Sequence, residues 1–250
     1  QEHAKLKGLT LGNAEKDYLI DIALMSISIH TKNELVFKGG TCLYKFYKLN
    51  RFSEDVDFSA ISNIDLDALV SHVISDFEKF GIKVVMHKKK EPHNSVLITL
   101  RIEGPLFSGK QISYATLGLD INLKSSVVLE PEFFTYNSFY PDIASVSALC
   151  MKQEEIFAEK IRALMSRRRA RDLFDLHFLI EKGVYANIKL IDKKMEYYNK
   201  KFDLNKLITN INSLEKLWKR ELQGFANLIP EFDIVSKKVI NELNNHYKND

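Results

Sequence analysis

Residues 37–59 read FKGGTCLYKFYKLNRFSEDVDFS and contain the features that decide the fold. Residues 34–37 predict a short strand, and the two glycines and threonine of residues 39–41 stand ahead of a run with helical apolar spacing. Asp55 and Asp57 then alternate with apolar residues, which predicts a strand buried on one face. The stretch therefore predicts a strand, a glycine turn, a helix and a second strand that carries two carboxylates.

The spacing of the two carboxylates indicates a cation site. Residues two apart in a strand project from the same face, so Asp55 and Asp57 would lie side by side and repel each other. Mg²⁺ would remove that repulsion, because hard cations take carboxylate oxygens together with substrate phosphates. Gly39 and Gly40 would leave N–H groups open to phosphate at a helix N-terminus, and Thr41 can add a hydroxyl. Separately, a glycine pair is often only a turn, and two spaced aspartates are often only solvated charges.

A third acidic residue lies in the predicted strand 114–125. Its apolar residues, Leu119 and Ile121, alternate with Asp120, which therefore projects from the opposite face. If this strand neighbours the strand of Asp55, then Asp120 supplies the third carboxylate that a metal pair needs. The sequence does not test this adjacency.

Composition predicts a globular protein of the cytoplasm. Of the 250 residues, 45% are hydrophobic, which is enough for a core. The 36 basic and 33 acidic residues leave a net charge of +3, so a nucleic acid would have to be bound by local clusters. The two cysteines have no metal-ligand spacing, and the apolar segment 18–29 is too short to cross a bilayer and contains Asp21. We expect neither export nor a membrane span.

The order of the predicted elements indicates an α+β fold in two domains. Helices are predicted over residues 14–30 and 66–80, and a hairpin over residues 82–90 and 95–104. From residue 153 onward the apolar spacing is helical, with a break around residues 167–170. We therefore expect a mixed α/β domain over residues 1–146 and a helical domain over residues 147–250.

The order of these motifs resembles a known superfamily. GG[T/S], then a helix, then DxD on the next strand is the signature of the DNA polymerase β-like nucleotidyltransferases. The string KGGTCLYKFYKLNRFSEDVDFS, residues 38–59, looks more specifically like the AbiEii/AbiGii toxin family, which includes the MenT toxins. Residues 154–180, EEIFAEKIRALMSRRRARDLFDLHFLI, are similar to the family's E-I-x-A-E-K-x-x-A-L and R-D-x-x-D-L segments. The resemblance covers residues 36–59 and 153–180, with Asp120 as a weaker match.

The resemblance implies a nucleotidyltransferase-fold mixed sheet with flanking helices, and a helical C-terminal domain that completes the cleft. It implies that Asp55, Asp57 and Asp120 bind Mg²⁺ or Mn²⁺, with Asp120 assisting or acting as base, and that Asp172 belongs to the active site. The implied nucleotide-binding residues are Lys38, Gly39, Gly40, Thr41, Arg51, Ser53 and Lys160. Arg51 and Ser53 fit the toxin pattern RxSxDxD, although loop capping would also explain them.

The residues of the second segment leave alternatives open. Lys160 falls within an apolar helical stripe, where an unpaired ammonium is costly, so it needs either a triphosphate or an acid such as Asp172. The resemblance favours the triphosphate. Asp175 can pair with Arg171 four residues earlier, the ordinary structural role of such a spacing. The arginines of residues 167–171 and the lysines of residues 88–90 are either solvated charges or contacts for an RNA backbone.

The resemblance also implies a function. A nucleotidyltransferase of this kind would transfer a nucleoside monophosphate from an NTP to an acceptor hydroxyl. In the MenT-like branch the acceptor would be the 3′ end of tRNA, and the protein would be the toxin of a pair with a cognate antitoxin. Two alternatives are transfer to a protein side chain and a non-catalytic NTP-binding or RNA-binding module. The presence of Asp55, Asp57 and Asp120 argues against the second alternative.

Overall fold

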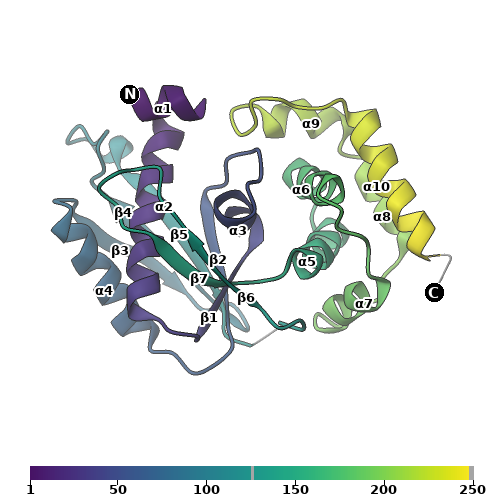
Figure 1. The fold of residues 1–250 in the computed structure, drawn as a ribbon, viewed down its shortest axis with the longest axis horizontal. Helices are drawn as coiled ribbons and strands as arrows, with labels where there is room; N and C mark the ends of the chain where they lie inside the picture. The colour runs from purple at the N-terminus through teal and green to yellow at the C-terminus, as the bar shows by residue number, and fades with distance from the viewer. Residues whose placement is uncertain (125–126, 248–250) are drawn as a thin grey trace. The chain divides into compact units, whose positions relative to one another are not determined.

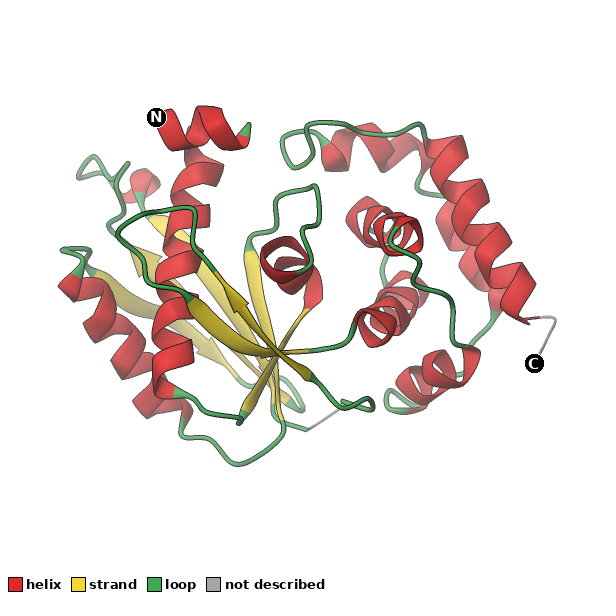
Figure 2. Ribbon diagram, viewed as in Figure 1, coloured by secondary structure: helices red, strands yellow, loops and turns green. Residues whose placement is uncertain are grey.

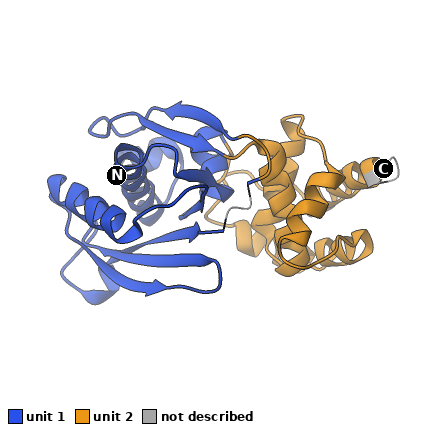
Figure 3. Ribbon diagram, turned by 90° about the horizontal axis from the view of Figure 1, so that it is seen from below, with its two compact units in different colours: residues 1–48, 52–127, 131–150 blue, residues 49–51, 128–130, 151–250 orange. Residues whose placement is uncertain are grey.

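The computed structural model describes residues 1–124 and 127–247, and the chain divides into two compact units (Figure 1). Unit 1 comprises Gln1–Lys48, Phe52–Val127 and Pro131–Cys150, drawn in blue in Figure 3. Unit 2 comprises Leu49–Arg51, Val128–Glu130 and Met151–Asp250, drawn in orange. Position 125 of the predicted strand 114–125 and positions 248–250 of the predicted helical domain lie outside the described residues.

The described part of unit 1 contains a seven-stranded mixed sheet in the order β3-β4-β5-β2-β1-β7-β6. The strands are β1 (Leu35–Lys38), β2 (Asp55–Ala60), β3 (Val84–Lys90), β4 (Ser95–Ile102), β5 (Ala115–Asn122), β6 (Glu132–Tyr136) and β7 (Val146–Cys150). β2 pairs with β5 and β1 pairs with β7 in parallel, and the other neighbours are antiparallel. The prediction of a mixed sheet with flanking helices is confirmed.

The helices of unit 1 include those predicted over residues 14–30 and 66–80 and the one predicted after the glycine turn, together with a first short helix that the sequence did not predict. They are α1 (Glu2–Lys7), α2 (Leu11–His30), α3 (Gly39–Phe46) and α4 (Leu66–Lys79), with a short 3₁₀ turn, η1 (Gln111–Ser113). The side chain of Asp65 caps α4 by accepting the N–H groups of Asp67 and Ala68. α2 packs against α4 and against β5 and β7, and α3 contacts β1, β2 and β6. This packing fixes α3 against the strand that carries Asp55 and Asp57.

Unit 2 is helical, and all the strands of the described residues lie in unit 1 (Figure 2). Its helices are α5 (Gln153–Ser166), α6 (Ala170–Glu181), α7 (Ile188–Glu196), α8 (Leu204–Asn212), α9 (Glu215–Leu222) and α10 (Phe232–Tyr247). The break between α5 and α6 falls at the predicted arginine run. Trp218 of α9 is 1% exposed and donates its indole N–H to the carbonyl oxygen of Pro230 at 2.8 Å, so it belongs to the core of unit 2.

Two strands of unit 1 have no counterpart in the sequence prediction. β6 and β7 are each five residues long and form a hairpin that joins the sheet through the parallel pairing of β7 with β1. Their side chains do not alternate between apolar and polar, so the strand period is hidden. This pairing carries unit 1 through Cys150, beyond residue 146. Among the described helices, none is both long enough and apolar enough to cross a bilayer.

Candidate active site

Asp57 and Asp120 lie opposite each other on neighbouring strands. In the parallel pair of β2 and β5, Asp57 is the register partner of Asp120, and Asp55 is the partner of Gly118. Register partners project from the same face of a sheet, as do residues two apart in one strand. Asp55, Asp57 and Asp120 therefore share one face, and the strand adjacency that the sequence left untested is present.

These carboxylates are accessible although their strands are largely buried. Asp55 is exposed, and Asp57 and Asp120 are half-buried, whereas Val56 and Phe58 on the opposite face of β2 are buried. Carboxylates on one face of neighbouring strands repel one another, and a cation offsets that repulsion. Their charge and accessibility suit the uptake of a divalent cation from solution.

The donor set fits Mg²⁺ or Mn²⁺ in its chemistry, since both ions are bound by carboxylate oxygens. Within residues 1–124 and 127–247, no three acidic, histidine or cysteine side chains are gathered closely enough to hold a metal ion as they stand. The register of β2 and β5 already places Asp57 beside Asp120.

The N-terminus of α3 lies against the carboxylate of Asp57. Gly39, the first residue of α3, has a φ of 76°, which residues with a side chain rarely adopt. A Cβ atom at Gly39 would also collide with Oδ2 of Asp57 and stand 3.1 Å from its Cγ. Glycine is therefore required here both by backbone conformation and by close approach. The open N–H groups of a helix N-terminus favour an anion beside them.

The other predicted nucleotide-binding residues of unit 1 lie in or next to β1, α3 and β2. Lys38 is the register partner of Asp57 in the antiparallel pair of β1 and β2. Thr41 is buried, and its hydroxyl donates to the main-chain carbonyl oxygen of Asp55, so it fixes α3 to the start of β2. Gly40, the second residue of α3, and Ser53, two residues before β2, are buried. Contacts of these residues with a nucleotide stay predictions.

Unit 2 contains a second charged cluster, in which cations and anions alternate. The Arg51 guanidinium holds Asp175 in a two-bond fork, with Nε and Nη2 each 2.7 Å from a carboxylate oxygen. Nζ of Lys160 lies 2.7 Å from Asp175 Oδ2 and 3.1 Å from Asp172 Oδ1. Nε of Arg167 lies 2.9 Å from Asp172 Oδ2. Three cations and two carboxylates thus form a chain with an excess of one positive charge.

Burial and charge act in opposite directions on this cluster. Burial raises the pKa of Asp172, but the attraction of Lys160 and Arg167 lowers it by a larger amount. The net result is a pKa of about 2, below the ordinary value. Burial likewise lowers the pKa of Lys160, yet Asp175 and Asp172 together raise it above its ordinary value. Both groups are therefore charged over the whole physiological range. Of the two partners left open for Lys160, the acid Asp172 is the one present, and contact with a triphosphate stays a prediction.

Asp175 pairs with Arg51 and Lys160 rather than with Arg171, the partner that the sequence left open. Asp175 is 0% exposed and is held by Arg51 and Lys160, while the Arg171 guanidinium carbon lies 4.7 Å from the centre of the Phe225 ring. Asp175 and Arg51 are 124 positions apart, so helical spacing could not find the pair. The only sequence signal was that both residues belong to motifs of one family. Arg51 therefore positions Asp175 within unit 2.

The acidic residue at the start of the E-I-x-A-E-K motif also has a structural role. Glu155 is 0% exposed, and its carboxylate accepts the N–H groups of Val128 and Leu129, each at 2.8 Å. Nζ of Lys194 lies 2.5 Å from Glu155 Oε1 and 3.1 Å from Glu159 Oε1. Neither residue pattern nor spacing indicated these contacts in the sequence. The motif thus ties the segment 128–130 and α7 to α5.

Comparison with known proteins identifies the family. The sequence profile described as "Nucleotidyl transferase AbiEii toxin, Type IV TA system" matches residues 24–238. The chain belongs to the AbiEii family. As an AbiEii protein it is a nucleotidyltransferase, and the family is one of toxins whose type IV systems include a cognate antitoxin. Its membership also implies a nucleotide substrate.

Solved structures support the fold of this AbiEii protein. The crystal structure of JHP933 from Helicobacter pylori is 24% identical, with a TM-score of 0.62 over 96% of this chain and 94% of that chain. MenT4, a nucleotidyltransferase toxin from Mycobacterium tuberculosis, is 16% identical, with a TM-score of 0.65 over 97% of this chain and 87% of that chain. A search of curated protein sequences found no match.

Proposed function

We propose that this AbiEii protein transfers a nucleoside monophosphate from an NTP to a hydroxyl of an RNA, with the 3′ end of tRNA as the acceptor. The observation that carries the proposal is the register of Asp57 with Asp120, with Asp55 on the same face and the N-terminus of α3 against Asp57. The arrangement offers a cation site and an anion site next to each other. A nucleoside triphosphate with its divalent cation has the matching charges.

In the proposed reaction the acceptor oxygen attacks the α-phosphorus of the NTP in line. The bond between the α-phosphorus and the bridging oxygen breaks, and pyrophosphate leaves. Divalent cations held by Asp55, Asp57 and Asp120 would supply stabilisation of negative charge on the attacking and leaving oxygens. Asp120, half-buried and beside Asp57, would accept the proton of the acceptor hydroxyl. The N–H groups of Gly39 and Gly40 would orient the leaving phosphates.

The proposal is tested by following the label from each of four α-³²P-labelled NTPs into total cellular RNA and protein, with Mg²⁺ present. We expect one or more NTPs to label a species of tRNA size that is destroyed by RNase and resists protease. Label that resists RNase and is removed by protease would instead establish nucleotidylation of a protein. Binding of NTP or RNA without any transfer would establish a non-catalytic module. An Asp57→Asn preparation is the matched control.

A further inference from the structure

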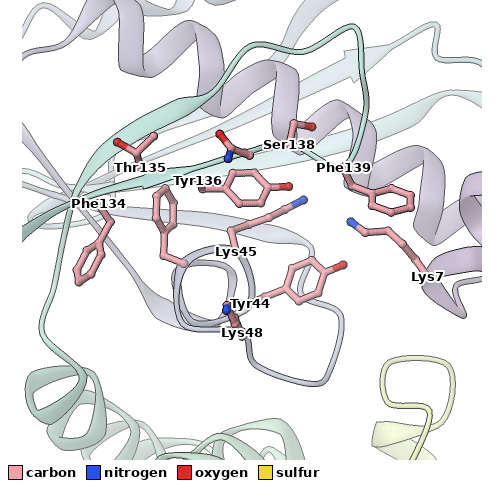
Figure 4. A pocket seen from close by; sticks show the side chains of 11 residues that line it. Lys7, Tyr44, Lys45, Lys48, Phe134, Thr135, Tyr136, Ser138 and Phe139 are labelled. Carbon is pink, nitrogen blue, oxygen red and sulfur yellow. The ribbon is translucent and has the colours of Figure 1, made fainter.

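Unit 1 contains a cavity of about 550 Å³ at the C-terminal end of α3 (Figure 4). Its wall combines three lysines with five aromatic side chains: Lys7, Lys45, Lys48, Tyr44, Phe46, Phe134, Tyr136 and Phe139. Thr135, Asn137 and Ser138 complete the lining, which contains no carboxylate among the described residues. The volume lies within the range of about 300–1,000 Å³ that is typical of small-ligand sites. The composition favours an anion with a flat aromatic part.

The floor of this aromatic–lysine pocket is held rigid by buried charges. Nζ of Lys45 lies 2.6 Å from Asp17 Oδ1 and 2.5 Å from Asp21 Oδ1, and Lys7 also pairs with Asp17. The Tyr136 hydroxyl donates to Asp21 at 2.8 Å. The two lysines balance the two aspartates, so this layer adds order to the pocket and almost no net charge. Because its hydroxyl is held by Asp21, the Tyr136 ring offers a ligand a surface that is already in position.

The aromatic rings are oriented by the same lysines. Nζ of Lys45 lies 5.1 Å from the centre of the Tyr44 ring and 5.6 Å from that of Tyr136, and Nζ of Lys7 lies 5.1 Å from that of Phe139. In Figure 4 the side chains of Lys45, Tyr44 and Tyr136 extend towards Lys7. Phe139 is 41% exposed, so part of its ring remains available to a ligand.

Lys48 supplies the excess positive charge of the pocket. It is exposed, two residues after the end of α3, and has a φ of 62°. A left-handed backbone is uncommon for residues other than glycine and asparagine and costs on the order of 1 kcal/mol or more. This is also the position at which helices commonly end in a left-handed residue, so the conformation belongs to the end of α3 and leaves Lys48 exposed beside the pocket.

The pocket and the carboxylate site are joined by one short helix. Gly39 at the start of α3 lies against Asp57, and Tyr44 and Phe46 near its end line the pocket. The eight residues of α3 span about 12 Å at ~1.5 Å per residue. This distance corresponds to roughly three stacked nucleotides at ~3.4 Å each.

We propose that the aromatic–lysine pocket binds an unpaired nucleotide of the acceptor RNA, a few positions before the 3′ hydroxyl that reacts. The inference rests on the proposed function, because it assumes an RNA acceptor. Aromatic side chains bind bases by stacking regardless of their identity, and an exposed lysine neutralises a neighbouring phosphate. The pocket would hold the RNA strand in place while its last nucleotide reaches the carboxylates. The nucleotide that occupies it belongs to the acceptor and is distinct from the NTP.

The test uses the full-length protein and a fluorescent six-nucleotide single-stranded RNA, with binding followed by anisotropy in the absence of NTP. The variants are Phe139→Ala and Lys48→Glu, both at exposed positions outside the carboxylate site, and Lys110→Glu is the charge-matched control on another loop of unit 1. We expect Phe139→Ala to weaken RNA binding about 5- to 100-fold, as for the loss of one stacked base. Lys48→Glu should weaken RNA binding several-fold, whereas Lys48→Arg, which keeps the positive charge, should bind RNA as wild type does. Lys110→Glu should leave the RNA affinity near the wild-type value.

Abasic substitution along the RNA identifies the occupant. We expect one abasic position near the third nucleotide from the 3′ end to reproduce the loss of RNA affinity. Phe139→Ala should cause little further loss on that RNA.

NTP affinity, measured separately with Mg²⁺, should be unchanged in both variants. A loss of NTP affinity with RNA binding intact would overturn the inference, because the pocket would then hold the NTP. If both variants bind RNA as tightly as wild type and transfer nucleotide to it at the wild-type rate, the inference is overturned. The proposed function would then still stand. Label transferred only to protein would overturn both.

Discussion

Asp57 of β2 and Asp120 of β5 are register partners in a parallel strand pair, although 62 residues of sequence separate them. The first residue of α3, Gly39, lies against the same Asp57 carboxylate. Asp57 therefore lies next to both Asp120 and the N-terminus of α3. The predicted effects of substitution in unit 1 follow from this arrangement.

The Asp120→Asn substitution should lower nucleotide transfer by about 10²- to 10⁴-fold, the usual contribution of a general base. The fold should be kept, because Asp120 is half-buried and the change removes repulsion beside Asp57. Initial rates at saturating NTP and a thermal unfolding curve measure the two effects. A rate loss accompanied by a large fall in the thermal midpoint would assign Asp120 to structure instead.

Gly39→Ala should reduce both stability and activity. Alanine at a φ of 76° is strained, at a cost of about 1–3 kcal/mol, and its Cβ would displace the Asp57 carboxylate. Gly109 is the matched control, because its φ of 81° is similar but a Cβ there meets nothing within 4 Å. Gly109→Ala should therefore cost stability alone. If both variants lose activity equally, displacement of Asp57 is not the cause.

Lys160→Met should destabilise the protein by about 3 kcal/mol, because it leaves the buried carboxylates of Asp172 and Asp175 with fewer cations. The control Arg168→Met removes an exposed cation of unit 2 and should cost less than about 0.5 kcal/mol. Urea unfolding of each variant gives the free energies. An unchanged unfolding free energy for Lys160→Met would show that the ion pairs of Lys160 do not stabilise the fold. That result would favour a contact of Lys160 with phosphate.

Stability should fall in acid through Asp172. Its pKa in the folded protein is about 2, below the ordinary value of 3.8, so the charged carboxylate is favoured by folding. The resulting stabilisation, on the order of 2 kcal/mol, is fully present above about pH 4 and is lost as the pH falls towards 2. Unfolding free energies of wild type and Asp172→Asn between pH 2 and 6 measure it. The difference between the two proteins should shrink as the pH falls, and a constant difference would contradict this account.

The part of the fold set by local periodicity could be predicted from the sequence. The glycine turn, α3 and the alternation around Asp55 and Asp57 lie within 23 consecutive residues, so the motif was visible without tertiary information. The pairing of β7 with β1 was not, because β7 shows no clear strand period and lies far from β1 in the sequence. The fork between Arg51 and Asp175 was missed for the same reason: a buried ion pair over that separation depends on the packing of unit 2.

The most direct test of the central claim uses one tRNA in two forms, with its 3′ hydroxyls intact or oxidised by periodate. Purified protein is incubated with Mg²⁺ and with NTP labelled at either the α- or the γ-phosphate. We expect incorporation from the α-labelled NTP into intact tRNA alone, none from the γ-labelled NTP, and none with Asp57→Asn. Equal labelling of oxidised tRNA, incorporation of the γ label, or full activity of Asp57→Asn would contradict it.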